Sequence, residues 1–405
     1  MPSTQTDRSQ PGGLRWLEDA LGGLDPRNWS ADNPTEALAM GIHALRSGLF
    51  VAESLPLFWL QRPQSNSKAK PPSSEALELT IKRLRELLER DAQIIGQGLA
   101  PLSVLTPRDP LSHGSRLLRI LADAQMVSNR KQKRNSKDFG SAAKNFLDEL
   151  PAYYRRNFHY QTDGYLSEKS AELYEHQVEL LFRGGADAMR RMIIPPLKKA
   201  LDTRKPGNGK KGQTSSRNRG NEGRGLRILE VGSGAGTATQ SVARAFPQAK
   251  ITCLDLSYPY TRHARKQLRD FERVECVQGD AANLEFGDEC FDAVFSVFLY
   301  HELPLPVREQ VLAESMRVLK PGGFFGFVDS LQKGDDEALD WALDFFPREF
   351  HEPYYAHYAA HPMETLIEEA GFASIENGTG YLAKWVSADK PADPDENEDK
   401  ISGDE

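Results

Sequence analysis

The sequence predicts an α/β fold, in which a doubly wound and mostly parallel sheet follows a mostly helical N-terminal region, and three observations support this. From Leu226 onward, short apolar runs alternate with stretches of helical periodicity, a pattern typical of βαβ units and parallel strands. Before residue 202, apolar residues recur mainly at helical spacing. The closing run ASIENGTGYLAKWVS is typical of two adjacent strands, which would add an antiparallel edge to the sheet.

Composition and charge exclude several classes of protein. The net charge is -7, and the acids and lysines between Asp389 and Glu405 account for most of it, so we expect no nucleic-acid partner. No apolar run approaches the roughly 20 residues of a membrane-spanning helix, and the first residues lack the apolar core of a signal peptide. The three cysteines show no paired spacing, which argues against disulfides and a zinc site. We therefore expect a cytoplasmic protein without a bound metal.

Changes in composition along the chain predict five segments. A hydrophobic fraction of 39% is below the roughly 45–50% of globular chains, so part of the chain is expected to be unpacked. We expect disorder in an N-terminus over 1–32, in a basic linker over 202–225 and in an acidic tail over 388–405. Between them lie a helical region over 33–201 and a sheet domain over 226–387.

Two helices are predicted first. Asn33 is a favourable N-cap and Pro34 suits the first helical position, so a helix should begin here. Its apolar stripe is predicted along one face, at Leu38, Ile42, Leu45 and Leu49. A second amphipathic helix has apolar residues at the same kind of spacing, at Leu77, Ile81, Leu84 and Leu88.

The rest of the helical region contains two further helices and two irregular stretches. A helix is predicted over Ser115–Val127, and the basic run Asn129–Lys137 after it is predicted as a solvated loop. The stretch Tyr153–Ser167 is rich in aromatic residues. Ser167 is a good N-cap for one long helix from Glu168 to about Ile194, before two prolines.

The stretch ILEVGSGAGTATQ, from Ile228 to Gln240, carries the strongest functional signal. A buried strand is followed by Glu230, by three glycines in the spacing GxGxG, and by a helix start. Glycines let the backbone turn tightly and approach a ligand, and the helix N-terminus presents free N–H groups. The dinucleotide pattern is GxGxxG, and an acid at position 230 would repel a pyrophosphate but suit a cationic amino group. S-adenosylmethionine has such a group and no phosphate.

Acids at the ends of the next two strands point to the same ligand. Asp255 ends the second strand, where a carboxylate accepts hydrogen bonds from ribose hydroxyls; capping of the following helix is the alternative role. Asp280 and Ala281 follow the third strand, where a carboxylate can accept a bond from an adenine amine. A turn-forming Asp280 is the alternative there.

The runs EVGSGAG, LDLS, GDA, FDAV and LKPGG, in this order, resemble the class I S-adenosylmethionine-dependent methyltransferases, in particular the small-molecule branch that includes ubiquinone and menaquinone C-methyltransferases. The resemblance covers about 226–387. It implies a seven-stranded sheet with six parallel strands and an antiparallel seventh. It also implies that the cofactor is held by residues of the strand ends, namely Glu230, Gly232, Ser233, Gly234, Gly236, Asp255, Leu256, Asp280, Ala281 and Phe298.

The stretch after the fourth strand is the expected place for catalytic residues. Methyltransferases that act on amino groups of bases or glutamine carry [DNS]-P-P-[YF] there, whereas this chain has Leu299–Pro304, which argues against those acceptors. His301 is a candidate general base that Glu302 could orient, or else a packing residue. Tyr300 is expected to pack beside the sulfonium, because aromatic faces attract cations.

Aromatic residues from two segments are predicted to form a lid over an apolar acceptor pocket. One segment lies before the first strand and the other between the fifth strand and the last helix. The candidates are Tyr160, Tyr165, His351, Tyr354, Tyr355 and Tyr358. Plain packing against the N-terminal helices is the alternative, and the irregular histidine spacing matches no metal site.

These observations predict an enzyme that transfers a methyl group from S-adenosylmethionine to an oxygen, carbon or nitrogen of a small or lipophilic metabolite. The helical region would cover the substrate or form the surface of a homodimer. Two alternatives stay open: a cofactor-binding sensor or assembly protein that has lost catalysis, and a nicotinamide-dependent oxidoreductase.

Overall fold

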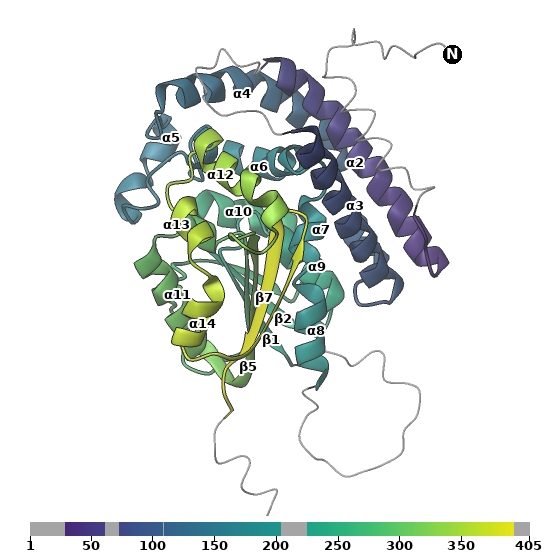
Figure 1. The fold of residues 1–405 in the computed structure, drawn as a ribbon. Helices are drawn as coiled ribbons and strands as arrows, with labels where there is room; N and C mark the ends of the chain where they lie inside the picture. The colour runs from purple at the N-terminus through teal and green to yellow at the C-terminus, as the bar shows by residue number, and fades with distance from the viewer. Residues whose placement is uncertain (1–28, 61–72, 108, 204–224, 393–405) are drawn as a thin grey trace, which may run out of the picture.

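A seven-stranded sheet forms the centre of the protein (Figure 1). The computed structural model describes residues 29–60, 73–107, 109–203 and 225–392. The strands are β1 Arg227–Val231, β2 Lys250–Asp255, β3 Val274–Gln278, β4 Phe291–Val297, β5 Leu319–Ser330, β6 Ala373–Gly380 and β7 Ala383–Asp389. Their order is β3-β2-β1-β4-β5-β7-β6, and β7 pairs antiparallel with both of its neighbours. The predicted sheet, with six parallel strands and one reversed strand, is confirmed.

Strict alternation along the central strands produces two apolar faces. Ile228 and Leu229 are consecutive in β1 and fully buried, yet they belong to different core clusters. One face packs on α8 (Ile194–Thr203) and α9 (Thr237–Ala245), and the other on α11 (Leu305–Val318) and α14 (Met363–Glu369) (Figure 1). Both faces being covered explains why the predicted strands are nearly continuous apolar runs.

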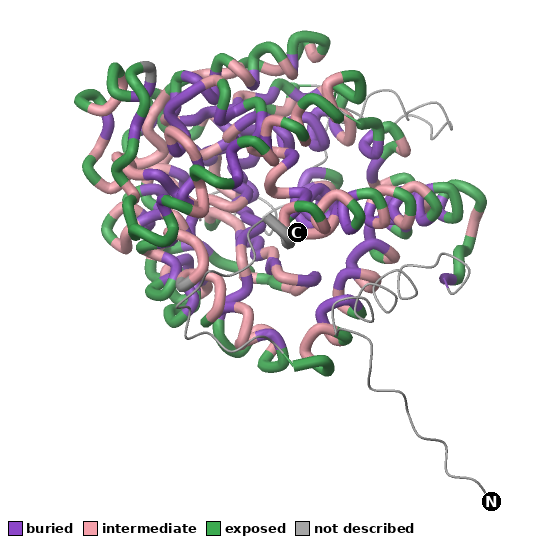
Figure 2. The backbone as a smooth tube through the Cα atoms, turned by 90° about the horizontal axis from the view of Figure 1, so that it is seen from above, coloured by how far each residue is buried: buried purple, intermediate pink, exposed green. Residues whose placement is uncertain are grey.

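The N-terminal helices lie over one end of the sheet and beside it (Figure 1). Figure 2 shows that buried backbone gathers in the interior of the molecule and exposed backbone at its periphery. The long ones are α2 Pro34–Leu60, α3 Ser74–Gly96, α4 His113–Lys133 and α6 Glu168–Leu181. Shorter helices complete the fold: α5 Ser141–Lys144, α7 Ala186–Arg191, α10 Tyr258–Gln267, α12 Asp340–Glu349, α13 Tyr355–Ala360 and the 3₁₀ turns η2 Leu102–Leu105, η3 Pro110–Ser112, η4 Leu147–Glu149, η5 Phe158–Tyr160, η7 Tyr300–Glu302 and η8 Glu337–Leu339. No helix in these described ranges is both long and apolar enough to cross a bilayer.

The predicted helix starts are confirmed at two positions. The Asn33 side-chain oxygen accepts the Glu36 backbone N–H at 3.0 Å, and the Ser167 hydroxyl accepts that of Ser170 at 3.1 Å. These bonds satisfy N–H groups that the first helical turn leaves free. Most residues of the segments predicted to be disordered, over 202–225 and at both ends, lie outside the described residues. Trp29, the first described residue, belongs to the N-terminal segment of this prediction and is buried.

The apolar stripe predicted for α2 was wrong at three of its four positions, and only Ile42 packs against the core. Leu38, Leu45 and Leu49 are exposed, Leu45 by 78%. The buried face instead carries a histidine, His43, which contacts Asp91 of α3 at 2.9 Å. Apolar residues on the same buried face, Met40, Phe50 and Val51, also hold this helix to its neighbours.

The stretch predicted as one long helix from Glu168 to about Ile194 contains two helices, α6 and α7, and α8 begins at its end, at Ile194. The break comes at Gly184, which has a φ of +83°, followed by Gly185. Glycine adopts this left-handed conformation readily and ends helices. The two prolines lie in the first turn of α8, where their missing N–H groups cost nothing.

The basic run predicted as a loop is partly helical, because α4 continues to Lys133. Arg130 is buried, and its guanidinium donates to the Tyr160 carbonyl at 2.8 Å and to the Thr162 hydroxyl. Its charge therefore serves to hold the aromatic stretch before α6, and solvation of the whole run was a wrong prediction.

Candidate active site

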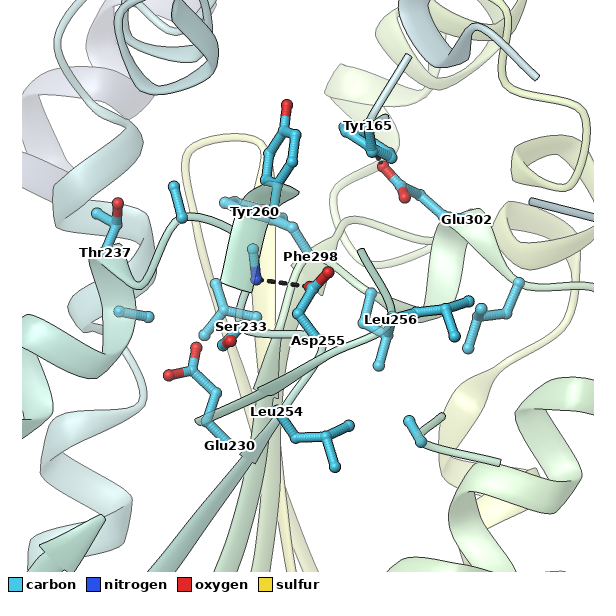
Figure 3. Close-up of a pocket in the computed structure, with 18 of the residues that line it drawn as sticks. Tyr165, Glu230, Ser233, Thr237, Leu254, Asp255, Leu256, Tyr260, Phe298 and Glu302 are labelled. Atoms are coloured by element: carbon cyan, nitrogen blue, oxygen red, sulfur yellow. Dashed lines mark hydrogen bonds between the residues drawn. The ribbon is translucent and has the colours of Figure 1, made fainter. Parts of the chain in front are cut away.

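A cavity of about 90 Å³ lies at the carboxyl ends of the central parallel strands (Figure 3). Its floor consists of the loops that follow β1, β2, β3 and β4, and its cover comes from the segment before α6 and from α6 and α7. In open α/β sheets this is the place where ligands bind. The floor residues are Glu230, Gly232, Ser233, Gly234, Ala235, Thr237, Ala238, Leu254, Asp255, Leu256, Gly279, Asp280, Ala281, Val297, Phe298, Leu299, Glu302, Leu303 and Val311.

The glycine loop after β1 has the conformation that the sequence predicts. Gly232, Gly234 and Gly236 have φ values of +70°, +55° and +83°, which side-chain-bearing residues rarely adopt. A Cβ atom at Gly234 would meet nothing within 4 Å, so the backbone borders open space there. Gly236 lies outside the cavity lining, contrary to expectation: it precedes α9, and a Cβ there would meet Leu268 at 2.8 Å. Its role is close packing against α10.

Asp255 at the end of β2 is fixed at the rim of this loop. One carboxylate oxygen accepts the Gly234 N–H at 2.8 Å (dashed in Figure 3), and the other accepts the Ser257 N–H at 2.8 Å. Burial raises the pKa of Asp255 to about 6, although the two N–H groups oppose the rise. A carboxylate held this way retains lone pairs for further donors. Ser257 caps α10 through its own hydroxyl, so Asp255 is free of that role.

Glu230 at the end of β1 is almost completely buried. Burial raises the pKa of this carboxyl to about 8, while a hydrogen bond from the Thr239 hydroxyl acts against the rise. A neutral buried carboxyl beside a cavity becomes ionised when a cation binds next to it, because the charged form is then stabilised. Glu230 therefore fits a ligand with a cationic amino group.

The loop after β3 provides a third side of the floor. Asp280 and Ala281 line the cavity, and the Asp280 carboxylate accepts the Ala282 N–H at 2.9 Å. Asp280 therefore also shapes its own turn, which was its alternative role. Leu256 and Phe298 line the cavity as well. Except for Gly236, the residues predicted to hold the cofactor thus surround one cavity, and their donors and acceptors fit S-adenosylmethionine.

Tyrosines close the cavity from the N-terminal side. Tyr153, Tyr154, Tyr165 and Tyr174 line it together with Tyr260 of α10. The rings of Tyr165 and Tyr260 lie 5.4 Å apart and edge-on, and Tyr165 donates its hydroxyl to Glu302 (Figure 3). These rings cover the ends of the strands on that side. Sequence reasoning marked the aromatic stretch but selected only Tyr165 of these residues.

The other predicted lid residues lie away from the cavity. Tyr160 packs on His351, with ring centroids 5.5 Å apart, and Arg156 stacks over Tyr354. Tyr355 bonds the Ser330 hydroxyl, and Tyr358 donates to the Ser330 carbonyl at 2.6 Å. Their role is packing against the end of β5 and the N-terminal region, which was the alternative reading.

Tyr300 and His301 do not line the cavity, because Glu302 is the one residue of the turn η7 that does. Tyr300 is fully buried and packs on Phe327 at 5.1 Å. His301 Nδ1 lies 2.5 Å from Asp329. Burial alone would lower the pKa of His301, but the Asp329 carboxylate raises it to about 9. A protonated imidazole cannot act as a general base. The His301 ring is oriented by Asp329 rather than by Glu302.

Two charged residues of the cavity carried no signal in the sequence. Arg190 of α7 and Glu175 of α6 line it, and they pair at 3.1 Å. The Arg190 guanidinium also lies 5.9 Å from the Phe298 ring. The glycine break before α7 brings Arg190 here, so a sequence reading with one continuous helix could not place it.

A charged cluster adjoins the cavity behind Glu302. His159, with a left-handed φ of +53°, lies 2.9 Å from Glu352 and 3.7 Å from Glu302. Burial opposes protonation, but Glu352 and Glu302 raise the pKa of His159 to about 10. These three side chains form a charged cluster next to the cavity.

Comparisons with known proteins agree with this geometry. Residues 228–323 match the family model described as a methyltransferase domain. The chain is 40% identical to the fatty-acid O-methyltransferase of Mycolicibacterium smegmatis over 119 residues. This stretch covers 29% of this chain and 42% of that protein. It is 33% identical over 154 residues to the malonyl-[acyl-carrier protein] O-methyltransferase of Geobacter sulfurreducens, 37% of this chain and 57% of that protein. The chain thus spans about half the length of the curated relatives it matches.

Proposed function

Because residues 228–323 match a methyltransferase domain and the sheet has the class I order, we propose that the protein transfers a methyl group from S-adenosylmethionine to a small lipophilic acceptor. One observation carries the proposal: Glu230, Gly234 and Asp255 meet at one cavity at the strand ends. Glu230 is an acid that can pair with the ammonium group of the cofactor, and Asp255 is an acid that can accept the ribose hydroxyls. The open backbone at Gly234 leaves room between them.

The cofactor supplies an already activated methyl group, so the protein has to align the reactants and exclude water. In this proposal Glu230 and the Gly232–Gly234 backbone hold the aminoacyl end, Asp255 holds the ribose, and Asp280 faces the adenine. The cover around Tyr165 keeps water out.

The acceptor is proposed to be an oxygen of a lipophilic molecule. The names of two relatives, the fatty-acid and the malonyl-[acyl-carrier protein] O-methyltransferases, indicate oxygen as their acceptor atom. In this chain Leu299, Leu303 and Val311 give the cavity an apolar side next to the Glu302–Tyr165 pair. Apolar walls with a few polar groups are typical of small-molecule sites.

We assign His301 and Tyr300 to positioning. Asp329 accepts the Tyr300 N–H at 2.7 Å and also binds the His301 ring, and these bonds fix the turn from which Glu302 enters the cavity. Glu302 is the residue of this turn that contacts the site, so it is the candidate for contact with the acceptor.

Two measurements test this function. Isothermal titration calorimetry with S-adenosylhomocysteine and, separately, NADH should show binding of the first alone. Formation of S-adenosylhomocysteine should then be followed with a fatty acid, an acyl thioester and a hydroxylated lipid as acceptors. NADH binding would refute the cofactor assignment, whereas cofactor binding without turnover on any lipid would favour a catalytically silent protein.

A homodimer and a cytoplasmic location belong to the proposal as well. The exposed leucines of α2, Leu38, Leu45 and Leu49, are the surface on which we place the second copy. Analytical ultracentrifugation of the wild type and of Leu45→Glu would decide this, since a dimer through α2 should dissociate in the variant. A monomeric wild type would contradict it.

A further inference from the structure

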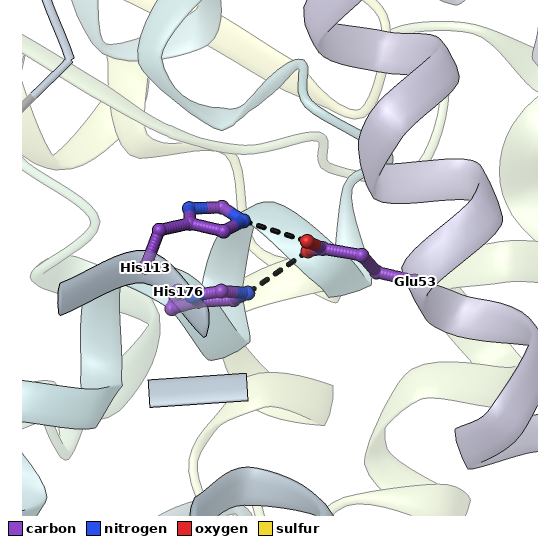
Figure 4. A group of neighbouring side chains, drawn as sticks. All are labelled: Glu53, His113 and His176. Carbon is purple, nitrogen blue, oxygen red and sulfur yellow. Dashed lines mark hydrogen bonds and ion pairs between the residues drawn. The ribbon is translucent and has the colours of Figure 1, made fainter. Parts of the chain in front are cut away.

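Three helices of the N-terminal region direct one polar side chain each to a common point, and none of the three side chains lines the cavity (Figure 4). Glu53 comes from α2, His113 from the start of α4 and His176 from α6. The residues are 60 and 63 positions apart in the chain, so the tertiary fold alone brings them together. The proposed methyl transfer uses none of them.

The two imidazoles turn the same ring atom to one carboxylate. His113 Nε2 lies 2.6 Å from Glu53 Oε1, and His176 Nε2 lies 3.0 Å from Glu53 Oε2. The ring centroids are 4.5 Å apart. The three ligand atoms lie within 4.8 Å of one another, so one ion can reach all of them with small side-chain rotations.

Burial gives the cluster a closed side and an open side. The side chains of His176 and Glu53 are 2% and 9% exposed, whereas that of His113 is 29% exposed. The Phe50 ring packs against both imidazoles, at 5.9 Å and 5.5 Å. A metal ion held here would therefore have an apolar wall behind it and solvent on the side of His113.

From these contacts we propose that Glu53, His113 and His176 bind a divalent transition-metal ion of the zinc class. Two imidazoles and one carboxylate form a donor set that suits Zn²⁺, Co²⁺ or Ni²⁺ and does not suit Ca²⁺ or Mg²⁺. Three protein ligands leave one position for a water molecule, which the exposed side of His113 admits. The ion would join α2, α4 and α6.

The ligand composition differs between this cluster and the one at His159. Here two imidazoles contact one carboxylate, Glu53, whereas at His159 a single imidazole lies between the carboxylates of Glu352 and Glu302.

The second nitrogen of His176 limits the affinity. His176 Nδ1 is buried without a hydrogen-bond partner among the described residues, whereas metal-bound histidines usually donate this N–H. Such a missing partner weakens metal binding about 10- to 100-fold, so we expect micromolar rather than nanomolar binding.

The experiment uses the full chain after treatment with a chelator. Calorimetry with ZnCl₂ should give one equivalent bound, and CoCl₂ should give the visible absorption of tetrahedral Co²⁺. Glu53→Gln and His113→Gln should each weaken zinc binding at least about tenfold. His113 is partly exposed, so its variant should fold even if the Glu53 variant does not, and circular dichroism checks this. The control is His361→Gln, which alters the stacked histidine pair of α13.

Each possible result either supports or overturns the proposed metal site. Zinc binding that His113→Gln abolishes and His361→Gln preserves supports the site, and a rise in melting temperature with zinc supports the joining of the helices. No zinc binding by the wild type would overturn the proposal, as would binding that His361→Gln alone removes. Neither result touches the methyl-transfer proposal, which is tested with S-adenosylhomocysteine.

Discussion

At the scale of single residues, the buried carboxyl of Glu230 makes cofactor binding depend on pH. Its pKa is raised to about 8 in the ligand-free protein, so it is mostly protonated at pH 7. A ligand ammonium favours the ionised form, so binding should release close to one proton per site at pH 7. Affinity for S-adenosylhomocysteine should therefore rise from pH 6 to pH 8.

Calorimetry at pH 7 in two buffers of different ionisation enthalpy measures the number of protons released on binding, and Glu230→Gln should reduce this number to near zero. Proton uptake in the wild type would contradict this prediction.

The same carboxyl makes the ligand-free protein less stable at high pH. The pKa of Glu230 in the folded protein lies above its value in the unfolded chain. The contribution of this carboxyl to the free energy of unfolding is therefore fully present below about pH 4.5 and is lost as pH rises through 8. Glu230→Gln removes this charge, and we expect the ligand-free variant to be more stable than the wild type at pH 8, by roughly 1–3 kcal/mol. Thermal unfolding at pH 6 and pH 8 checks it. An equal difference at both pH values would contradict the account.

A buried ion pair fixes the turn after β4. Asp329 is fully buried and holds the His301 ring and the Tyr300 N–H. Asp329→Asn leaves the His301 charge without its partner, so we expect a loss of about 3–5 kcal/mol in the free energy of unfolding. Chemical denaturation measures this loss. A variant as stable as the wild type would show that the pair does not hold the turn.

At the scale of elements, we expect the tyrosine cover to set how long the cofactor stays bound. Tyr165→Phe removes the hydroxyl bond to Glu302 while keeping the ring in the cavity wall. We expect the dissociation rate of S-adenosylhomocysteine to rise several-fold, because the cover then opens more easily. Stopped-flow measurement of dissociation tests this. Tyr355→Phe is the matched control, since that hydroxyl bonds Ser330 away from the cavity.

The same scale shows what the sequence can predict. The strands and the glycine loop could be predicted, because short apolar runs and the spacing of glycines are local properties of the sequence. The buried face of α2 could not, because His43 and Asp91 form their pair only in the folded protein. The pocket roles of Arg190 and Tyr174 depend on the break at Gly184 and on contacts between distant segments. The predicted roles of Tyr300 and His301 failed because one turn decides which of three neighbouring side chains enters the cavity.

At the scale of the whole molecule, the helical region is part of the site rather than an appendage. The sheet supplies the floor of the cavity, and Tyr165, Tyr174 and Arg190 supply its cover from the N-terminal side. The methyltransferase family model matches residues 228–323, which lie in the sheet part, and the two relatives described above match 29% and 37% of this chain. The N-terminal helices are thus where acceptor preference specific to this protein is expected to reside.

The central claim is that the loop after β1 holds an aminoacyl nucleoside, and one comparison tests it most directly. Gly234 and Gly334 have left-handed φ values, +55° and +93°, and at both a Cβ would meet nothing within 4 Å. Only Gly234 borders the cavity. Gly234→Val should abolish S-adenosylhomocysteine binding in calorimetry, while Gly334→Val, with a comparable backbone strain, should bind like the wild type. Undiminished binding by a folded Gly234→Val protein would contradict the account.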